Sequence, residues 1–221
     1  MTRTFRLALA PALALSLLLL LLGGCTNPFK PADPEPPSGD AVPEDFSSID
    51  ATLGTMATAI QARTTNGANA YIHAFAESTV AGQRAFRAFH DPAAKAAWLT
   101  NSGGQSAPEP WLLVNERGLY SELSRIRPND AYIFLFTPDA GNGNDEEIAT
   151  DVWSVHRHYE LFATPLNTDP VTIAAGFADL LIQKDGARWT IFEWHDRVDP
   201  KYGVNPPDTQ RSFTYYRLES Q

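Results

Sequence analysis

Two histidines, His156 and His158, stand two residues apart in a segment with the composition of a β-strand. Alternate side chains of a strand point to the same face, so both imidazoles are expected on one face. Such a pair can ligate zinc, but a structural zinc site needs four ligands and a catalytic site needs three. Nothing in the sequence places His195 beside His156. We therefore favour either a solvated face of the sheet or the polar lining of a cone, and we predict no metal.

Asp179 interrupts an apolar alternation that runs through residues 173–181. An unpaired carboxylate is costly to bury. In a closed cavity its pKa would rise, and it could then transfer protons while Tyr159 or Tyr71 donates a hydrogen bond to an oxyanion. The alternative is that Asp179 faces solvent or pairs with Arg188 across a hairpin. We expect the second arrangement, because perturbed acids mark functional sites only statistically.

Other catalytic patterns have no support in the sequence. It contains no G-x-S-x-G elbow, Walker loop, H-E-x-x-H or C-x-x-C motif. The acidic segment from Asp139 to Glu146 lacks the alternating ligand spacing of a calcium loop and is interpreted as a hairpin tip. Trp194 is kept as a candidate ligand-binding residue together with His156 and His158, although a core position is the expectation for this tryptophan. No cofactor is predicted.

The elements that must position these residues change in type along the chain. The apolar residues Ile49, Leu53, Met56 and Ile60 are spaced by four, three and four, which predicts a helix capped by Ser47 or Ser48. Further helices are predicted over residues 71–76, 85–89 and 92–103.

After Pro110, β-branched and aromatic residues dominate. Strands are predicted over residues 111–114, 120–126, 131–136, 152–162, 171–183, 188–195 and 212–218. Asp185-Gly186 is the clearest turn, because glycine supplies the positive φ of a tight hairpin. Helices followed by antiparallel strands predict an α+β domain with the helices packed on one face of a sheet.

This pattern resembles the nuclear transport factor 2-like superfamily. The resemblance rests on the N-terminal helices, the long antiparallel strands and the late sequence from Asp185 to Ile191 that leads to Trp194. It covers roughly Ile49 to Glu219 and implies a cone of helices over a strongly curved antiparallel sheet. Members of this superfamily include ketosteroid isomerase, scytalone dehydratase and non-enzymatic binding modules. The fold alone therefore does not assign an activity.

The N-terminus, Met1 to Gly24, is predicted to be a secretory leader. Two arginines precede an apolar run, Leu7 to Leu22, that ends in Leu22-Gly23-Gly24-Cys25. This tetrapeptide resembles the lipobox of bacterial lipoproteins, which implies a diacylglyceryl group on the Cys25 thiol and cleavage after Gly24. The alternative, an uncleaved membrane helix, is disfavoured because the run is shorter than the ~20 residues that span a bilayer.

Lipidation of Cys25 would have further consequences. It is the single cysteine, so neither a disulfide nor a thiol nucleophile is expected. Two or three acyl chains hold a protein on a membrane durably. Thr26 differs from the aspartate that resembles an inner-membrane retention signal, so an exported protein on the periplasmic face of an outer membrane is expected. Residues 25–46 are rich in proline and acid and predict a linker, and residues 47–221 predict one domain.

The charge of the chain argues against one class of function, nucleic-acid binding. The chain has a formal net charge of −9, and the leader contains no acidic residue, so the mature protein is acidic and is not expected to bind nucleic acid. Our leading hypothesis is a lipid-anchored envelope module without catalytic activity that binds a protein partner or a small apolar ligand. The alternative is a cofactor-free lyase or isomerase that uses an acid in the cone. An open pocket with convergent acids and hydroxyls would favour the enzyme, and an interior filled with Phe and Trp would favour the module.

Overall fold

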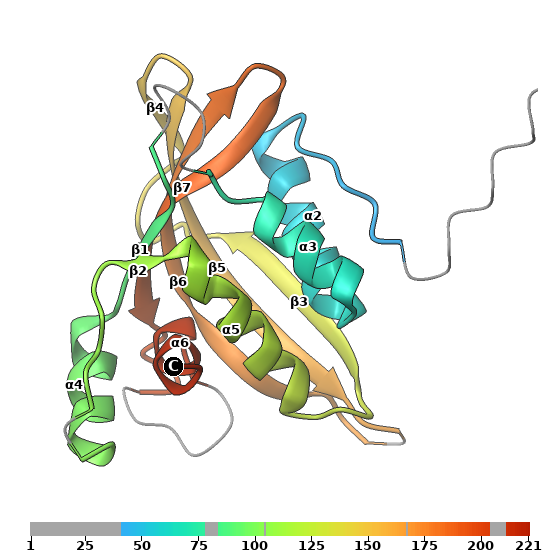
Figure 1. Ribbon diagram of the computed structural model, residues 1–221, viewed down its shortest axis with the longest axis vertical. Helices are drawn as coiled ribbons and strands as arrows, with labels where there is room; N and C mark the ends of the chain where they lie inside the picture. The colour runs from blue at the N-terminus through green and yellow to red at the C-terminus, as the bar shows by residue number, and fades with distance from the viewer. Residues whose placement is uncertain (1–40, 78–83, 104, 167, 204–210) are drawn as a thin grey trace, which may run out of the picture. The chain divides into compact units, whose positions relative to one another are not determined.

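A computed structural model describes residues 41–77, 84–103, 105–166, 168–203 and 211–221. The predicted leader, Cys25 and the linker up to residue 40 lie outside this part of the chain. The described helices are α2 (Ile49–Ala62), α3 (Thr65–His73), α4 (Pro92–Asn101), α5 (Leu113–Arg125) and α6 (Phe213–Glu219). The strands are β1 (Arg87–Phe89), β2 (Trp111–Leu112), β3 (Ala131–Pro138), β4 (Glu146–Ala149), β5 (Val152–Thr164), β6 (Val171–Asp185) and β7 (Arg188–Val198) (Figure 1).

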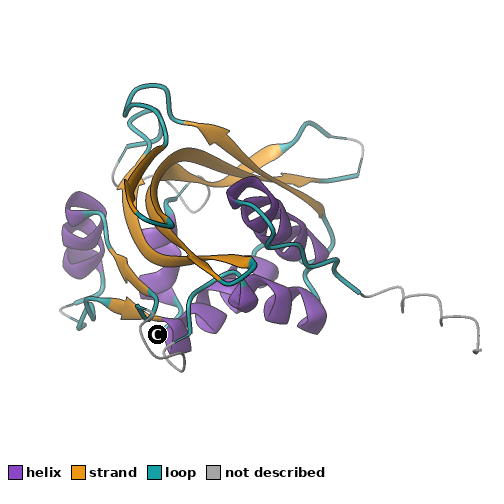
Figure 2. Cartoon of the chain, turned by 90° about the horizontal axis from the view of Figure 1, so that it is seen from above, coloured by secondary structure: helices purple, strands orange, loops and turns teal. Residues whose placement is uncertain are grey.

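All seven strands form one sheet in the order β2-β1-β7-β6-β5-β3, with β4 also paired to β5. The pairs are antiparallel except β1 with β7, which is parallel. This one pair departs from the antiparallel sheet expected from the sequence. Register shifts between Leu161 and Phe162, and between Leu181 and Ile182, interrupt the long strands, and such bulges increase bending and twist. Figure 2 shows the long strands curving strongly beside the helices. The expected α+β domain is confirmed.

Helix α2 forms where the apolar spacing predicts it. The side chain of Ser48 accepts a hydrogen bond from the backbone N–H of Ala51 at 3.1 Å, which caps the helix. Leu53, Met56 and Ile60 are buried in the main core. The helix contacts α3, β3 and β7, so its apolar stripe faces the sheet.

Helix α6 contributes a second set of apolar side chains to the interior. Residues 213–218 are all buried, and the helix contacts α4, α5, β6 and β7. The ring of Phe213 stacks at centroid distances of 5.8 Å on Phe134 and 5.6 Å on Trp194, and it lies 4.4 Å from Tyr159. Aromatic rings from the sheet and from the C-terminal helix therefore fill this part of the cone.

Two segments predicted as strands are helices, and the strand predicted over residues 111–114 ends at Leu112, after which α5 begins. Residues 120–126 belong mostly to α5, in which Glu116, Leu119, Tyr120 and Leu123 are buried at helical spacing. Residues 212–218 belong to α6. That helix is buried on every side, so its sequence lacks the polar face from which an amphipathic helix is recognised.

The segment predicted as a helix over residues 85–89 contains strand β1 instead. Ala88 is buried between an exposed Arg87 and a partly exposed Phe89, which is the alternation of a strand. Parallel pairing with β7 stabilises it. A partner more than 100 residues away along the chain, and not local propensity, selects this conformation.

Ordered contacts begin before Ser47, within the last residues of the predicted linker. Phe46 is buried, and its carbonyl oxygen accepts a hydrogen bond from the Trp189 N–H at 2.8 Å. Val42 also packs against the core. Of the helices in the described ranges, none is both long and apolar enough to cross a bilayer.

Candidate functional site

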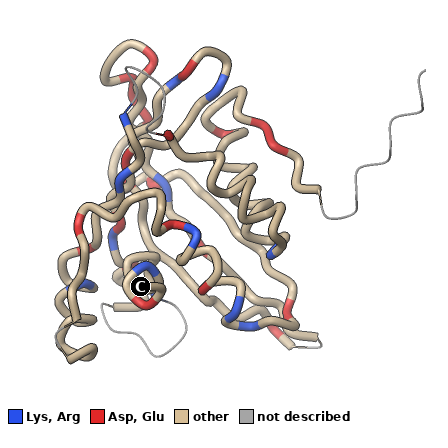
Figure 3. Tube along the Cα trace, in the orientation of Figure 1, with Lys and Arg blue, Asp and Glu red and all other residues tan. Residues whose placement is uncertain are grey.

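Asp179 lies on the outer face of β6 and is bound by basic groups from both neighbouring strands. His156 Nδ1 is 2.8 Å from Asp179 Oδ1, and Arg197 Nε donates to Asp179 Oδ2 at 2.8 Å. The expected surface pairing therefore occurs, but the partner is Arg197. Arg188 instead donates to the carbonyl oxygen of His73. Figure 3 shows basic and acidic residues interspersed along the described trace.

These contacts shift the titration of Asp179. Partial burial alone would raise the pKa of its carboxyl, but hydrogen bonds from Arg197 and His156 outweigh burial and hold the pKa below its ordinary value of 3.8. At neutral pH the group is an ion-paired carboxylate that already accepts hydrogen bonds. It is therefore poorly suited to act as a protonated acid in a cavity.

We expect the Asp179→Asn substitution to lower the free energy of unfolding by about 1 kcal/mol at pH 7, because the ion pair is only partly buried. Since the folded-state pKa lies below the unfolded value, this contribution is present above about pH 4 and is lost as the pH falls through the lowered pKa. Urea denaturation from pH 3 to pH 7 measures the change. The exposed Asp185→Asn is the matched control, and a difference between Asp179→Asn and wild type that does not shrink in acid would contradict the assignment.

The histidines of the sheet do not converge. His156 contacts Asp179, while His158 Nε2 lies 3.0 Å from Asp199 Oδ2 and His195 Nε2 lies 2.7 Å from a carboxylate oxygen of Glu193. Each imidazole is thus held by a different acid. In the described part of the chain, no three His, Cys, Asp or Glu side chains are arranged to hold a metal ion.

The buried acid of the cone is Asp196, on the inner face of β7. Tyr159 Oη donates to Asp196 Oδ1 at 2.7 Å, and the backbone N–H groups of Phe213 and Thr214 donate to Tyr159 Oη at 2.8 Å and Asp196 Oδ2 at 2.6 Å. Burial raises the pKa of both side chains above their ordinary values. Both groups are occupied by the start of α6, so this acid and tyrosine hold the helix in place.

Asp179 was the one acid that the sequence analysis weighed for the cavity, with a surface position expected for it, and Asp196 was not weighed for that role. The sequence did contain a pattern that points to Asp196. This residue lies two positions after the buried Trp194 in strand β7, and residues two apart in a strand share a face. Trp194 itself is fully buried between Phe213 and the guanidinium of Arg217, which lies 4.9 Å from its ring centroid. It is a core residue in this fold.

Tyr71 belongs to a second buried polar network, centred on Glu116. Tyr71 Oη donates to Glu116 Oε1 and Trp111 Nε1 donates to Glu116 Oε2, each at 2.8 Å. Arg217 Nη2 donates to Oε1 at 2.8 Å, and Arg217 Nε donates to Oε2 at 3.1 Å. Glu116 and Arg217 have 0% side-chain exposure. Burial alone would lower the pKa of Arg217, but the charge of Glu116 and its hydrogen bonds raise it.

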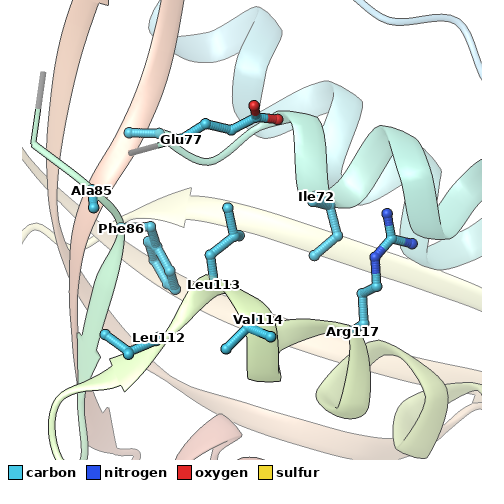
Figure 4. A pocket seen from close by; sticks show the side chains of 9 residues that line it. Ile72, Glu77, Ala85, Phe86, Leu112, Leu113, Val114 and Arg117 are labelled. Carbon is cyan, nitrogen blue, oxygen red and sulfur yellow. The ribbon is translucent and has the colours of Figure 1, made fainter. Parts of the chain in front are cut away.

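This network joins α3, β2, α5 and α6 behind a surface pocket. The pocket has a volume of about 600 Å³, and we call it the α3–α5 pocket. Its lining residues are Ile72, Ala76, Glu77, Ala85, Phe86, Leu112, Leu113, Val114 and Arg117 (Figure 4). Three lining residues directly follow members of the network in sequence: Ile72 follows Tyr71, Leu112 follows Trp111, and Arg117 follows Glu116. The buried hydrogen bonds therefore fix the walls of the pocket.

The chemistry of the α3–α5 pocket is mostly apolar. Phe86 is buried, whereas Leu112 is 47% exposed and Val114 is 78% exposed. Figure 4 shows Glu77 along the upper edge and Arg117 at the right-hand edge, with the apolar side chains beside and below them. The volume lies within the ~300–1,000 Å³ that is usual for small-molecule sites.

None of the residues singled out from the sequence lines this pocket. Tyr71 directly precedes the lining residue Ile72 and belongs to the polar network. A signal was present in Leu112-Leu113-Val114, because three consecutive apolar residues at the start of a helix cannot all face one core. The pocket also needs Ala76 and Phe86, which a backbone hydrogen bond of 3.0 Å joins in the folded chain.

No protein-family model matches the sequence, and no curated protein is significantly similar to it. Structure comparison matches the chain to a protein of unknown function from Mycobacterium tuberculosis (12% identity, 78% of this chain and 91% of that chain covered, TM-score 0.48). It also matches ActVI-ORFA from Streptomyces coelicolor (7%, 67% and 92%, TM-score 0.46) and an NTF2-like protein of unknown function from Shewanella oneidensis (14%, 67% and 94%, TM-score 0.35). The observed arrangement, with helices packed on a strongly curved sheet, is the α+β architecture expected from the sequence.

Proposed function

We propose that this protein is a lipid-anchored module of the cell envelope that binds a small apolar ligand in the α3–α5 pocket. The single observation that carries the proposal is this pocket, whose walls are apolar and whose rim residues Leu112 and Val114 remain exposed. Large exposed apolar residues that gather around a concavity are typical of a binding site. The predicted lipid on Cys25 would keep the site at a membrane, where apolar molecules are concentrated.

The arrangement of the acids supports binding rather than proton transfer. The acid and tyrosine that meet inside the cone, Asp196 and Tyr159, are bound to backbone groups of α6. Asp179 is paired with Arg197 on the outer face. Neither Tyr159 nor Asp196 lines the α3–α5 pocket. A lyase or isomerase would need such groups to face its substrate.

Binding can be tested with the neutral dye Nile red and the full mature chain carrying Cys25→Ser, which needs no detergent. We expect the dye to bind and 1-dodecanol to displace it. The double variant Leu112→Gln, Val114→Gln should weaken binding about 10-fold or more, because two apolar contacts worth about 1 kcal/mol each are lost. Both side chains are already exposed, so the melting temperature should change little.

Leu166→Gln is the matched control, since Leu166 is 88% exposed and does not line the pocket. It should leave dye binding at the wild-type level. Equal dye binding by wild type and the double variant would remove the α3–α5 pocket from consideration as the site.

The anchor is tested separately in the precursor. We expect Cys25→Ser to abolish labelling with radioactive palmitate and to shift the protein from the membrane to the soluble fraction or to an unprocessed form, because acyl chains are the anchor that the sequence predicts. Palmitate incorporation into the variant at the wild-type level would contradict lipidation at Cys25.

A further inference from the structure

We infer that the ligand of the α3–α5 pocket is an amphipathic monocarboxylate, with its apolar chain against the pocket wall and its carboxylate bound by Arg117. This inference rests on the proposed function of the pocket and goes beyond it by naming the head group. It is carried by the position of one guanidinium at the rim of a cavity whose other lining residues are apolar except Glu77.

Arg117 has hydrogen-bonding capacity to spare. Its Nη1 donates to the neutral amide oxygen of Asn69 at 3.1 Å, and among the described residues no carboxylate lies within ion-pair distance of its guanidinium. A guanidinium has five N–H donors in a planar fork, which matches the two oxygens of a carboxylate. One donor used for Asn69 therefore leaves enough for a bidentate contact with a ligand.

The backbone at Arg117 is held by the residue that precedes it. Arg117 follows Glu116, which four buried hydrogen bonds fix against α3, β2 and α6. The contact with Asn69 further ties the Arg117 side chain to α3. A positioned donor loses less conformational entropy on binding than a free surface arginine does. Arg117 is therefore placed to contribute specificity as well as long-range attraction.

The rest of the pocket restricts the ligand further. Ile72, Phe86 and Leu113 offer only apolar contacts, which suits an aliphatic or aromatic chain. Glu77 lies on the upper edge in Figure 4 and would repel a second anionic group. A molecule with one carboxylate and one apolar chain can contact both Arg117 and the apolar residues. A dicarboxylate would in addition place a charge near Glu77.

The test compares dodecanoate with 1-dodecanol as competitors of Nile red, below their aggregation concentrations and at pH 7.5, on the mature chain carrying Cys25→Ser. The two ligands share one chain and differ in the head group. We expect wild type to prefer dodecanoate by about tenfold, and Arg117→Gln to reduce this preference to about one. High salt should also reduce the preference, because Arg117 is exposed.

Arg125→Gln is the matched control, since Arg125 lies on the same helix, is 77% exposed and does not line the pocket. It should keep the tenfold preference. If dodecanoate and dodecanol bind wild type equally, or if Arg117→Gln keeps the preference, the carboxylate inference is overturned while apolar binding stands. If neither competitor displaces the dye and the dye itself does not bind, the proposed function fails as well.

Discussion

Replacing Arg217 with methionine is expected to lower the free energy of unfolding by about 3–5 kcal/mol, because Glu116 would remain as a buried carboxylate without its cation. Both side chains have 0% exposure and share two hydrogen bonds of 2.8 and 3.1 Å. Neither can reach water to recover the lost interaction. Urea denaturation followed by tryptophan fluorescence measures the effect at pH 7.

A second variant separates the unpaired charge from lost packing. In Glu116→Gln combined with Arg217→Met, the buried charge is gone and the amide oxygen can still accept a hydrogen bond from Tyr71 or Trp111. We expect this double variant to be more stable than Arg217→Met alone, by about 1–3 kcal/mol. The exposed Arg125→Met should change stability by less than about 0.5 kcal/mol. A loss below 1 kcal/mol for Arg217→Met would mean that the ion pair does not form.

The same network is expected to affect binding. Tyr71, Trp111 and Glu116 each precede a residue that lines the α3–α5 pocket. When the network is broken, the walls lose their common anchor. Arg217→Met should therefore weaken Nile red binding even under conditions in which the variant remains folded, whereas Arg125→Met should not.

The second large effect is expected at Trp194. Its side chain is 0% exposed and lies between the ring of Phe213 and the guanidinium of Arg217. Trp194→Ala would leave a cavity beside α6 and should cost about 3–5 kcal/mol of unfolding free energy. Trp194→Phe retains an aromatic ring and should lose clearly less stability than Trp194→Ala.

This prediction also tests whether Trp194 contacts a ligand, as the sequence allowed. If Trp194 is a core residue, the affinity of Trp194→Phe for dodecanol should stay within about twofold of wild type, because effects at separate sites are nearly independent. A Trp194→Ala variant of wild-type stability with greatly weakened ligand binding would return Trp194 to the binding site.

Local patterns in the sequence were enough to predict much of the sheet and helix α2. The alternation along β5 placed His156 and His158 on one face, and the burial of this strand follows that alternation, with Tyr159 buried on the opposite face. Such patterns can be recognised in a sequence because each depends only on residues a few positions apart in the chain. The leader and Cys25 were likewise recognised from adjacent residues, and they remain predictions.

The partner of Asp179 could not be read in this way. A register shift between Leu181 and Ile182 places His195, and not Trp194, opposite Asp179. Arg197, two residues further along β7, then shares the outer face with Asp179 as its diagonal neighbour. One extra residue in a strand reverses which side chains share a face, and no local pattern marked its position.

Which residues fill the interior and which line the α3–α5 pocket is determined by the tertiary structure alone. Glu116 and Arg217 are 101 residues apart, and each would be expected on the surface from its type. They are buried because α6, which lacks an amphipathic pattern, packs against α5 and the sheet. The sequence by itself determined the α+β class and the faces of the long strands, since these follow from periodicity. The buried ion pair, the filled cone and the α3–α5 pocket depend on which distant elements meet, and that is a property of the folded chain.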